Sequence, residues 1–371
     1  MTTSTDPADR PATGASPATP AASATSAASA ARTVLAPPAT PAAPTGPASS
    51  GRPGTSQQPP AGPPPARPPR SATGGPAAFA PTGPSAPVPP GTRTVLAHRG
   101  ASALAPENTL AAYRLAADHG ARWVELDVDV ISDGTIIVIH DSRLDRTTNR
   151  TGPYYGLTAA DLPTIDAGSW FHAPAASTAT GRTAAGQAPP APVPLTPVPA
   201  SPGPFAGEPL PTLAQALELL GARGLGVNVE LKSCQAGATA CRWLVDGVAE
   251  ILDEHARAFP GCEVLVSSFN PVLLDRMGAR RPLTRRALLV ERRLLLDDWR
   301  SYAEMLGVEA VNPADAGLER GRVEEIRSLG YGVNVWTVNS RRRAEELFEW
   351  GVTGVFTDRV HELGDLERGA C

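Results

Sequence analysis

The feature that most constrains this chain is the alternation of short apolar runs with helical patterns through its second part. Eight runs rich in Val, Ile and Leu have the length of β-strands, and they cover residues 94–98, 123–128, 226–232, 263–269, 286–290, 309–312, 332–338 and 354–357. Eight strands that alternate with helices predict a closed (β/α)8 TIM barrel, with an open doubly wound sheet as the weaker alternative. No glycine-rich dinucleotide loop follows the first run.

Helical patterns lie between these runs, at residues 109–119, 212–220, 243–255, 323–329 and 340–350, and one begins at Asn270-Pro271. The first is predicted to end at Gly120, the residue type that most often follows a helix C-terminus. One connection has no room for a helix, because only Ser132-Asp133-Gly134 and a few neighbours precede the run 136–140. This Asp-Gly step predicts a β-hairpin whose second strand is an extra, antiparallel strand near the active site.

Two segments have the composition of chain without a core. Residues 1–91 are almost all Ala, Pro, Ser, Thr and Gly, with Phe79 as the only aromatic residue, so we predict a disordered tail. Residues 173–204 have a similar composition and no periodicity, which predicts a low-complexity insertion loop. About 250 residues remain, the usual length of one TIM barrel, so a single domain is predicted over 92–371.

Overall charge and cysteine content exclude several classes of protein. A formal net charge of −4 gives no reason to expect a nucleic-acid partner. No apolar run has the length of a transmembrane segment or of a signal peptide, so we expect a cytoplasmic location. Four cysteines are too few and too irregularly spaced for a zinc site. Free thiols are expected, with a Cys234–Cys241 disulfide as the alternative in an oxidising compartment.

Polar residues stand at or near the ends of several predicted strands: His98, Arg99, Glu125, Asp127, His140, Glu230 and Lys232. The C-terminal ends of the strands form the active-site face of a TIM barrel, so these side chains are expected to converge. Residues two apart on a strand point to the same face, which places Glu125 beside Asp127. The same spacing places Glu230 beside Lys232, the only lysine in the chain.

This set of residue types suits a metal ion and a phosphate. Three carboxylates, Glu125, Asp127 and Glu230, would repel one another inside a barrel without a cation. Oxygen ligands favour a hard divalent metal ion, Ca²⁺ or Mg²⁺, whereas zinc would be expected to recruit the histidines as well. Arg99 and Lys232 supply the positive charge that complements a phosphate group.

The two histidines at strand ends, His98 and His140, are predicted to form a general acid-base pair, because histidine titrates near neutral pH. A metal ion beside them would polarise a phosphoryl oxygen. Taken singly, a Glu-x-Asp step or a histidine at a strand end is usually structural. The prediction rests on their coincidence at successive strand ends.

These residues form a highly specific pattern that resembles the glycerophosphodiester phosphodiesterase family. The likeness runs through residues 94–360 and is carried by His98-Arg99-Gly100, Pro106-Glu107-Asn108-Thr109, Glu125-Leu126-Asp127, Asp133-Gly134, His140-Asp141, Leu144-Asp145-Arg146-Thr147-Thr148, Asp166-Ala167-Gly168-Ser169-Trp170-Phe171, Glu230-Leu231-Lys232, Trp336-Thr337-Val338-Asn339 and Thr357-Asp358. It is interrupted only by the stretch read as an insertion.

The resemblance implies a metal-dependent enzyme that hydrolyses glycerophosphodiesters, small-molecule substrates, to an alcohol and sn-glycerol 3-phosphate. By that resemblance His98 and His140 are the acid-base pair, and the metal ligands are Glu125, Asp127 and Glu230. Arg99 and Lys232 would bind the phosphate. Trp336 would line the glycerol or leaving-group side. The implied route is attack by the neighbouring glycerol hydroxyl through a cyclic phosphate, which water then opens.

For Glu107 and Asn108 we favour capping of the first helix over a role in the site. Two alternatives to the leading activity stay open. One is a lysophospholipase D that acts on lysophospholipids and needs an apolar groove at the barrel mouth. The other is a catalytically silent barrel that binds a phosphodiester, which predicts damage to the two histidines or three carboxylates, and none is seen.

Overall fold

The computed structural model describes residue 84 and residues 88–172 and 203–367. Most of the tail predicted for 1–91, and most of the insertion predicted for 173–204, lie outside the described residues. Both of these predictions, and the domain limits 92–371 that depend on them, therefore stay predictions.

Eight parallel strands close into a barrel within the described residues. β1 pairs with β2 on one side and with β9 on the other, and this closes the ring. The strands are β1 (Thr94–His98), β2 (Trp123–Val130), β4 (Gly226–Leu231), β5 (Val264–Ser268), β6 (Arg285–Val290), β7 (Ala310–Pro313), β8 (Gly332–Val335) and β9 (Gly354–Thr357). The predicted (β/α)8 TIM barrel is confirmed, because the pairing of β1 with β2 joins the two ends of the sheet, which would stay apart in an open sheet.

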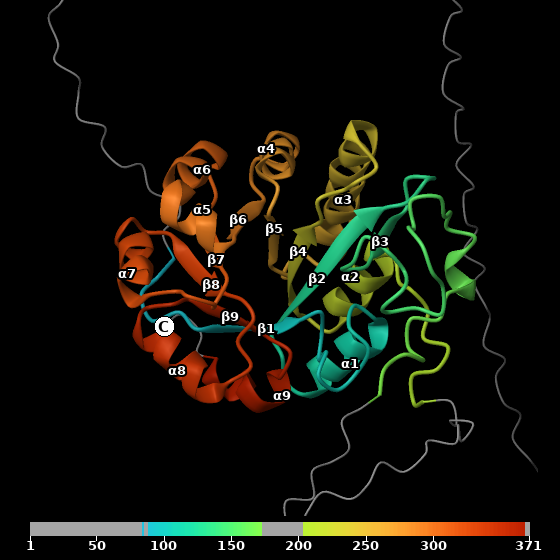
Figure 1. Ribbon diagram of the computed structural model, residues 1–371, viewed down its shortest axis with the longest axis horizontal. Helices are drawn as coiled ribbons and strands as arrows, with labels where there is room; N and C mark the ends of the chain where they lie inside the picture. The colour runs from blue at the N-terminus through green and yellow to red at the C-terminus, as the bar shows by residue number, and fades with distance from the viewer. Residues whose placement is uncertain (1–83, 85–87, 173–202, 368–371) are drawn as a thin grey trace, which may run out of the picture. The chain divides into compact units, whose positions relative to one another are not determined.

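Helices surround this ring (Figure 1). They are α1 (Leu110–Asp118), α2 (Leu213–Ala222), α3 (Ala238–Ala258), α4 (Pro271–Arg280), α5 (Arg292–Asp297), α6 (Trp299–Leu306), α7 (Arg320–Ser328), α8 (Arg341–Glu349) and α9 (Val360–Leu363), with 3-10 turns η1 (Leu162–Thr164) and η2 (Gly364–Leu366). The sequence analysis missed α5, α6 and α9. These are short helices with no capping side chain at the N-terminus; α5 and α6 follow β6, and α9 follows β9.

Helix α2 illustrates how the sequence fixes the outer layer. Thr212 and Gln215 form a capping box, in which the side chain of each residue accepts a hydrogen bond from the backbone N–H of the other. Leu213, Leu217 and Leu220 then recur on one face and are all buried against the barrel. Each such leucine contributes about 2 kcal/mol through removal of its apolar surface from water.

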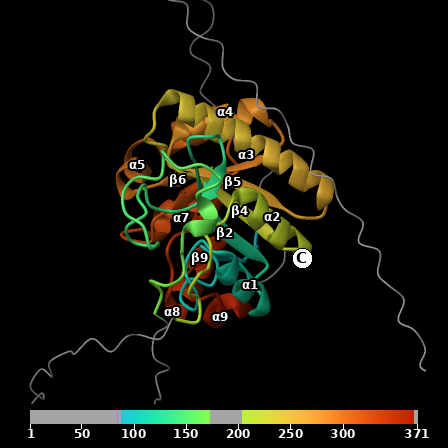
Figure 2. The ribbon, with the colours of Figure 1, turned by 90° about the vertical axis from the view of Figure 1, so that its right-hand side faces the viewer.

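The predicted hairpin is confirmed. β3 (Ile136–Val138) runs antiparallel to β2 and extends it beyond the barrel wall. The segment from 139 to 172 then packs over this extension around a core of its own, made of Ile131, Ile137, Ile139, Leu144, Tyr154, Leu162, Ile165, Ala167 and Leu210. Figure 2 shows this segment, coloured green, in front of the strands that carry the site. One side of the barrel mouth is therefore lined by chain that belongs to no barrel repeat.

The two stretches that flank residues 173–202 are fastened to each other. Asp166 Oδ1 accepts the Gly168 N–H at 2.8 Å, and its Oδ2 accepts the Gly207 N–H at 2.9 Å. Phe171 stacks edge-on against Phe205 with ring centroids 5.7 Å apart. The point at which the chain leaves the described structure thus lies beside the point at which it returns.

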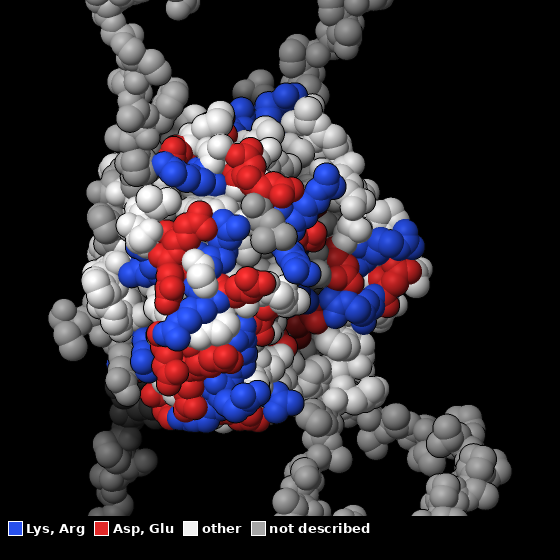
Figure 3. Space-filling model, turned by 60° about the vertical axis from the view of Figure 1, so that its left-hand side comes forward, with Lys and Arg blue, Asp and Glu red and all other residues white. Residues whose placement is uncertain are grey.

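No helix of the described residues is long and apolar enough to cross a bilayer, and the cytoplasmic location stays a prediction. Cys234 and Cys241 are free thiols, and the Cys241 Sγ lies 3.7 Å from the Cys234 carbonyl oxygen. On the face drawn in Figure 3, basic and acidic side chains are interspersed.

Candidate active site

Three buried carboxylates meet at the C-terminal ends of β2 and β4. The strands pair in parallel with Asp127 opposite Glu230, and Glu125 lies two residues earlier on the same face of β2. One oxygen of each carboxylate lies within 4.8 Å of one oxygen of each of the others. Glu125, Asp127 and Glu230 are 2%, 1% and 9% exposed, so the predicted convergence occurs inside the barrel mouth.

The three carboxylates do not share their charge equally. Burial, followed by the charges of Asp127 and Glu230, raises the pKa of Glu125 well above its ordinary value. Burial and Asp127 raise the pKa of Glu230 to about 7. For Asp127 burial acts in the same direction, but the charges of Lys232 and Arg99 outweigh it and hold the pKa below its usual range. Without a further cation, Asp127 is therefore the carboxylate of the three that most readily holds a negative charge at neutral pH.

Lys232 is the first of two basic residues that lie against these carboxylates. Its Nζ is 2.7 Å from Glu230 Oε1 and 3.2 Å from Asp127 Oδ1. These contacts, against the cost of burial, raise the pKa of Lys232 above its ordinary value. The ammonium group is therefore fixed in charge and in place beside the carboxylate cluster.

Arg99 approaches from the other side. Its backbone adopts a positive φ of 57°, which turns its N–H toward Glu125 Oε2 at 2.9 Å. Its guanidinium group contacts Glu107 at 2.8 Å and comes within 3.4 Å of Asp127. The atom that approaches Asp127 is the buried Nε, so this nitrogen faces the carboxylate as an ion-pair partner although it makes no hydrogen bond among the described residues.

Glu107 and Asn108 belong to the site, and the helix-capping role favoured for them was wrong. Thr109 caps α1 by accepting the Ala112 N–H. Asn108, also at positive φ, donates from Nδ2 to Asp127 Oδ2 at 2.8 Å. The cap falls on Thr109, while Glu107 contacts Arg99 and Asn108 contacts Asp127 in the barrel mouth.

His98 is held by a network from the far end of the chain. Its Nδ1 lies 2.7 Å from Asp358 Oδ1, and this aspartate also accepts from Ser102 Oγ at 3.0 Å and Asn339 Nδ2 at 2.6 Å. Burial would raise the pKa of Asp358, but the hydrogen bond with His98 and the other donors lower it to about 2. The carboxylate is ionised at neutral pH and fixes the orientation of the imidazole.

His140 has a matching partner. Its Nδ1 lies 2.7 Å from Asp141 Oδ1, and Arg146 Nε donates to Asp141 Oδ2 at 2.7 Å. Arg146 also pairs with Glu107 at 2.6 Å, so the His140 loop is tied to the segment after β1. Burial lowers the pKa of His140 despite the opposing charge of Asp127. The ring is therefore mainly neutral near pH 7.

A cavity of about 300 Å³ connects these parts. Its walls are His98, Arg99, Glu125, His140, Asn228, Glu230, Ser267, Phe269, Leu289, Glu291, Trp336, Thr337 and Phe356. Trp336 stacks edge-on against Phe269 with centroids 5.4 Å apart, and its Nε1 donates to the Asn312 carbonyl at 2.8 Å. Of the predicted site residues, Asp127 and Lys232 do not line this cavity but contact those that do.

Most of the residues that sequence reasoning missed act through a predicted one. Asp358 and Ser102 contact His98 directly, and Asn339 holds Asp358. Asp358 and Asn339 stood within the family-like motifs, but only the pairing of β9 with β1 brings them to a residue some 260 positions earlier. Both stand one residue beyond a predicted strand, 332–338 for Asn339 and 354–357 for Asp358, and this was the available signal.

Fold and site together define a class: a TIM-barrel enzyme with two carboxylate-paired histidines and a buried acidic cluster at the catalytic end of the strands. Comparison with known proteins narrows this class. The model of the glycerophosphoryl diester phosphodiesterase family matches residues 98–362. The chain belongs to this family.

Individual relatives agree with this assignment. The chain is 31% identical over 278 residues to a glycerophosphodiester phosphodiesterase of Bacillus subtilis, with 74% of this chain and 86% of the relative covered. It is 31% identical over 275 residues to a glycerophosphodiester phosphodiesterase of Caldanaerobacter subterraneus, with 74% and 97% covered. Among solved structures, a phosphodiesterase of Oleispira antarctica in complex with the product sn-glycerol-3-phosphate matches with a TM-score of 0.62 and 29% identity, over 74% of this chain and 96% of that one.

Proposed function

We propose that this chain hydrolyses glycerophosphodiesters to an alcohol and sn-glycerol 3-phosphate, with a divalent metal ion held by Glu125, Asp127 and Glu230. The observation that carries the proposal is that His98 and His140 line the same cavity as two of these carboxylates. Support also comes from the relatives of Bacillus subtilis and Caldanaerobacter subterraneus, which are glycerophosphodiester phosphodiesterases, and from the product bound to the Oleispira antarctica enzyme.

The carboxylate cluster fits a hard cation. The three carboxylates have oxygens within 4.8 Å of one another, and the charge of Asp127 raises the proton affinity of Glu125 and Glu230; a divalent ion would relieve that repulsion. Ca²⁺ and Mg²⁺ both prefer such ligands. The histidines are engaged by Asp358 and Asp141 through Nδ1, a partnership suited to proton transfer at Nε2. When bound, the ion would polarise a phosphoryl oxygen and stabilise the charge that develops on it.

The two histidines would divide the proton transfers. His98 would take the proton from the glycerol hydroxyl next to the phosphodiester, and that oxygen would form a bond to phosphorus. His140, in the fraction of the enzyme whose ring carries the proton at Nε2, would give that proton to the departing alcohol as its oxygen–phosphorus bond breaks. The resulting cyclic phosphate would then be opened by water with the two roles reversed, which yields glycerol 3-phosphate and restores both histidines.

Basic and aromatic groups would hold the substrate. Arg99 lines the cavity, and Lys232 contacts the cavity residue Glu230 at 2.7 Å, so both basic groups can neutralise a phosphate. Trp336 offers an indole face to the glycerol portion, because its N–H is already used by a backbone carbonyl.

An activity panel tests the proposal. The purified chain, with Ca²⁺ or Mg²⁺, is supplied with glycerophosphocholine, glycerophosphoethanolamine, glycerophosphoglycerol and lysophosphatidylcholine. We expect glycerol 3-phosphate from the first three. Lysophosphatidic acid released in preference would instead establish a lysophospholipase D. No product from any substrate, with the folded protein and either ion, would leave the catalytically silent barrel as the surviving reading.

A further inference from the structure

A second cavity, of about 580 Å³, opens beside the one that holds the histidines. The two cavities share His140, Glu230 and Phe269 as walls. Since His140 would protonate the departing alcohol, that alcohol lies on the side of this second cavity. The charge and the residue types of its wall should therefore indicate which headgroup the enzyme accepts.

Asp129 is the unusual residue of this cavity. It lies on β2 two positions after Asp127, is 1% exposed, and contributes to the cavity wall. Its Oδ2 accepts from the hydroxyl groups of Tyr154 at 2.7 Å and Tyr155 at 2.9 Å, while Oδ1 accepts the Val130 N–H at 2.7 Å. These partners are all neutral donors, so they hold the carboxylate in place without cancelling its charge.

Every other charged group on the cavity wall is already paired. Arg143 pairs with Asp145 at 3.0 Å, Arg146 with Asp141 at 2.7 Å and Lys232 with Glu230 at 2.7 Å. Within the part of the chain that the structure describes, no basic side chain pairs with Asp129. Asp129 is therefore a buried carboxylate on the cavity wall that has no basic partner among the described residues, and a cationic ligand could supply one.

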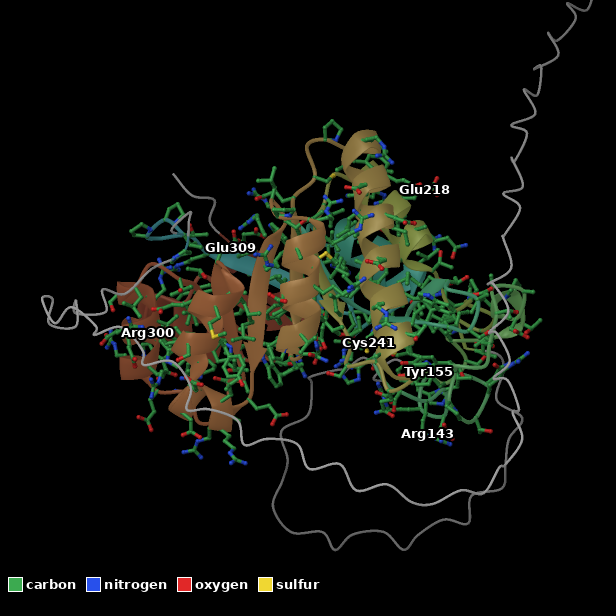
Figure 4. All side chains as sticks on the ribbon, turned by 90° about the horizontal axis from the view of Figure 1, so that it is seen from above. Arg143, Tyr155, Glu218, Cys241, Arg300 and Glu309 are labelled. Atoms are coloured by element: carbon green, nitrogen blue, oxygen red, sulfur yellow. The ribbon has the colours of Figure 1, made fainter. Side chains whose placement is uncertain are left out.

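Aromatic rings lie next to this charge. Tyr154 and Tyr155 have ring centroids 4.6 Å apart, and Phe269 closes the wall toward the histidines. The Gln235 N–H donates to the Tyr155 hydroxyl at 2.9 Å, which fixes this ring against the loop after β4. In Figure 4 Tyr155 lies between Cys241 on α3 and Arg143 on the outer segment. A carboxylate with aromatic faces is the arrangement that binds ammonium groups.

We propose that this second cavity is a headgroup subsite for alcohols that carry an ammonium group, of the ethanolamine or choline type, and that Asp129 determines this specificity. The inference rests on the proposed phosphodiesterase activity. It predicts that the enzyme prefers cationic glycerophosphodiesters to those with a neutral polyol such as glycerol.

The experiment compares kcat/KM for glycerophosphocholine and glycerophosphoethanolamine with that for glycerophosphoglycerol. Asp129→Asn keeps the shape of the side chain and removes its charge. The matched control is Glu218→Gln, which makes the same change at an exposed position on α2 well apart from Tyr155 in Figure 4. We expect the ratio of cationic to neutral kcat/KM to fall about 10-fold or more in Asp129→Asn, and to stay within about twofold in the control.

Two further arms keep the test decisive. Tyr155→Leu removes one aromatic face, and the same ratio should fall by about 3-fold to 10-fold even if Asp129→Asn does not fold. Lysophosphatidylcholine carries the same ammonium group on an acylated glycerol, so its kcat/KM tells which source supplies the headgroup. A wild-type kcat/KM for glycerophosphoglycerol equal to or above that for the cationic substrates would overturn the proposed subsite, although the phosphodiesterase activity would still stand. Absence of turnover on all substrates would instead refute the activity on which it rests.

Discussion

Replacement of Asp358 by Asn is the most informative single perturbation of this site. The asparagine keeps the shape of the side chain and one of its two acceptor oxygens, which at present accept from Ser102 and Asn339, but it removes the negative charge 2.7 Å from the His98 ring. The carboxylate pKa of about 2 lies nearly two units below the ordinary value of 3.8. At about 1.4 kcal/mol per unit this corresponds to at most about 2.5 kcal/mol, shared among all its partners.

The portion that belongs to His98 is smaller. Asp358 is 33% exposed and has two further donors, so solvent screening and sharing reduce the figure to about 1 to 1.5 kcal/mol. We expect kcat to fall about 5-fold to 10-fold, with KM for glycerophosphodiesters nearly unchanged, because the charge supports the imidazolium formed during the reaction. Steady-state release of glycerol 3-phosphate measures both constants.

Unfolding at different pH gives an independent check. The folded-state pKa of Asp358 is depressed, so its contribution to stability is present above about pH 4 and is lost as the pH falls toward 2. Asp358→Asn should lower the free energy of unfolding at pH 7 and lose part of this acid dependence. Asp365→Asn, which removes an exposed carboxylate paired with Arg341, is the matched control. A kcat within twofold of wild type, or a change confined to KM, would show that Asp358 does not position His98.

Three further outcomes follow from the same contacts. His98→Ala and His140→Ala should each abolish turnover while metal binding, followed by calorimetry, is largely kept; near-normal kcat across pH in either variant would refute the acid-base assignment. Glu125→Ala should lose both activity and metal binding, and in the wild type a chelator should lower Tm and remove activity, with both restored by Ca²⁺ or Mg²⁺; an unchanged Tm would count against the metal site. Gly168→Ala should lower Tm by several degrees, because its Cβ would lie 1.8 Å from the Phe205 carbonyl oxygen; a neutral effect in thermal melts would show that this junction rearranges freely.

The barrel could be predicted because each strand carries its own local signal. Runs of Val and Ile followed by capped helices, such as the helix that begins after Thr212, predict each strand–helix repeat without any knowledge of long-range contacts. Helices α5 and α6 were missed for the converse reason. Neither has a side-chain cap, and the Arg-rich run after Val290 offers little periodicity to detect.

The site was predictable as a set of strand ends but not as a network. Glu125 and Asp127 share a face through a spacing of two, which any strand imposes. Asp358 beside His98, and Glu107 between Arg99 and Arg146, depend on ring closure and on the path of an irregular segment. No local rule encodes such long-range contacts, so sequence reasoning gave Glu107 a helix-capping role.

The junction held by Asp166 has a consequence for how this enzyme can diversify. Because this carboxylate binds Gly168 and Gly207, and Phe171 packs on Phe205, the two chain ends at this point are closed without help from whatever lies between them. Insertions, deletions and replacements between these two stretches should therefore cost the barrel little conformational entropy. The sequence at this junction can therefore change in evolution independently of the site residues at the strand ends.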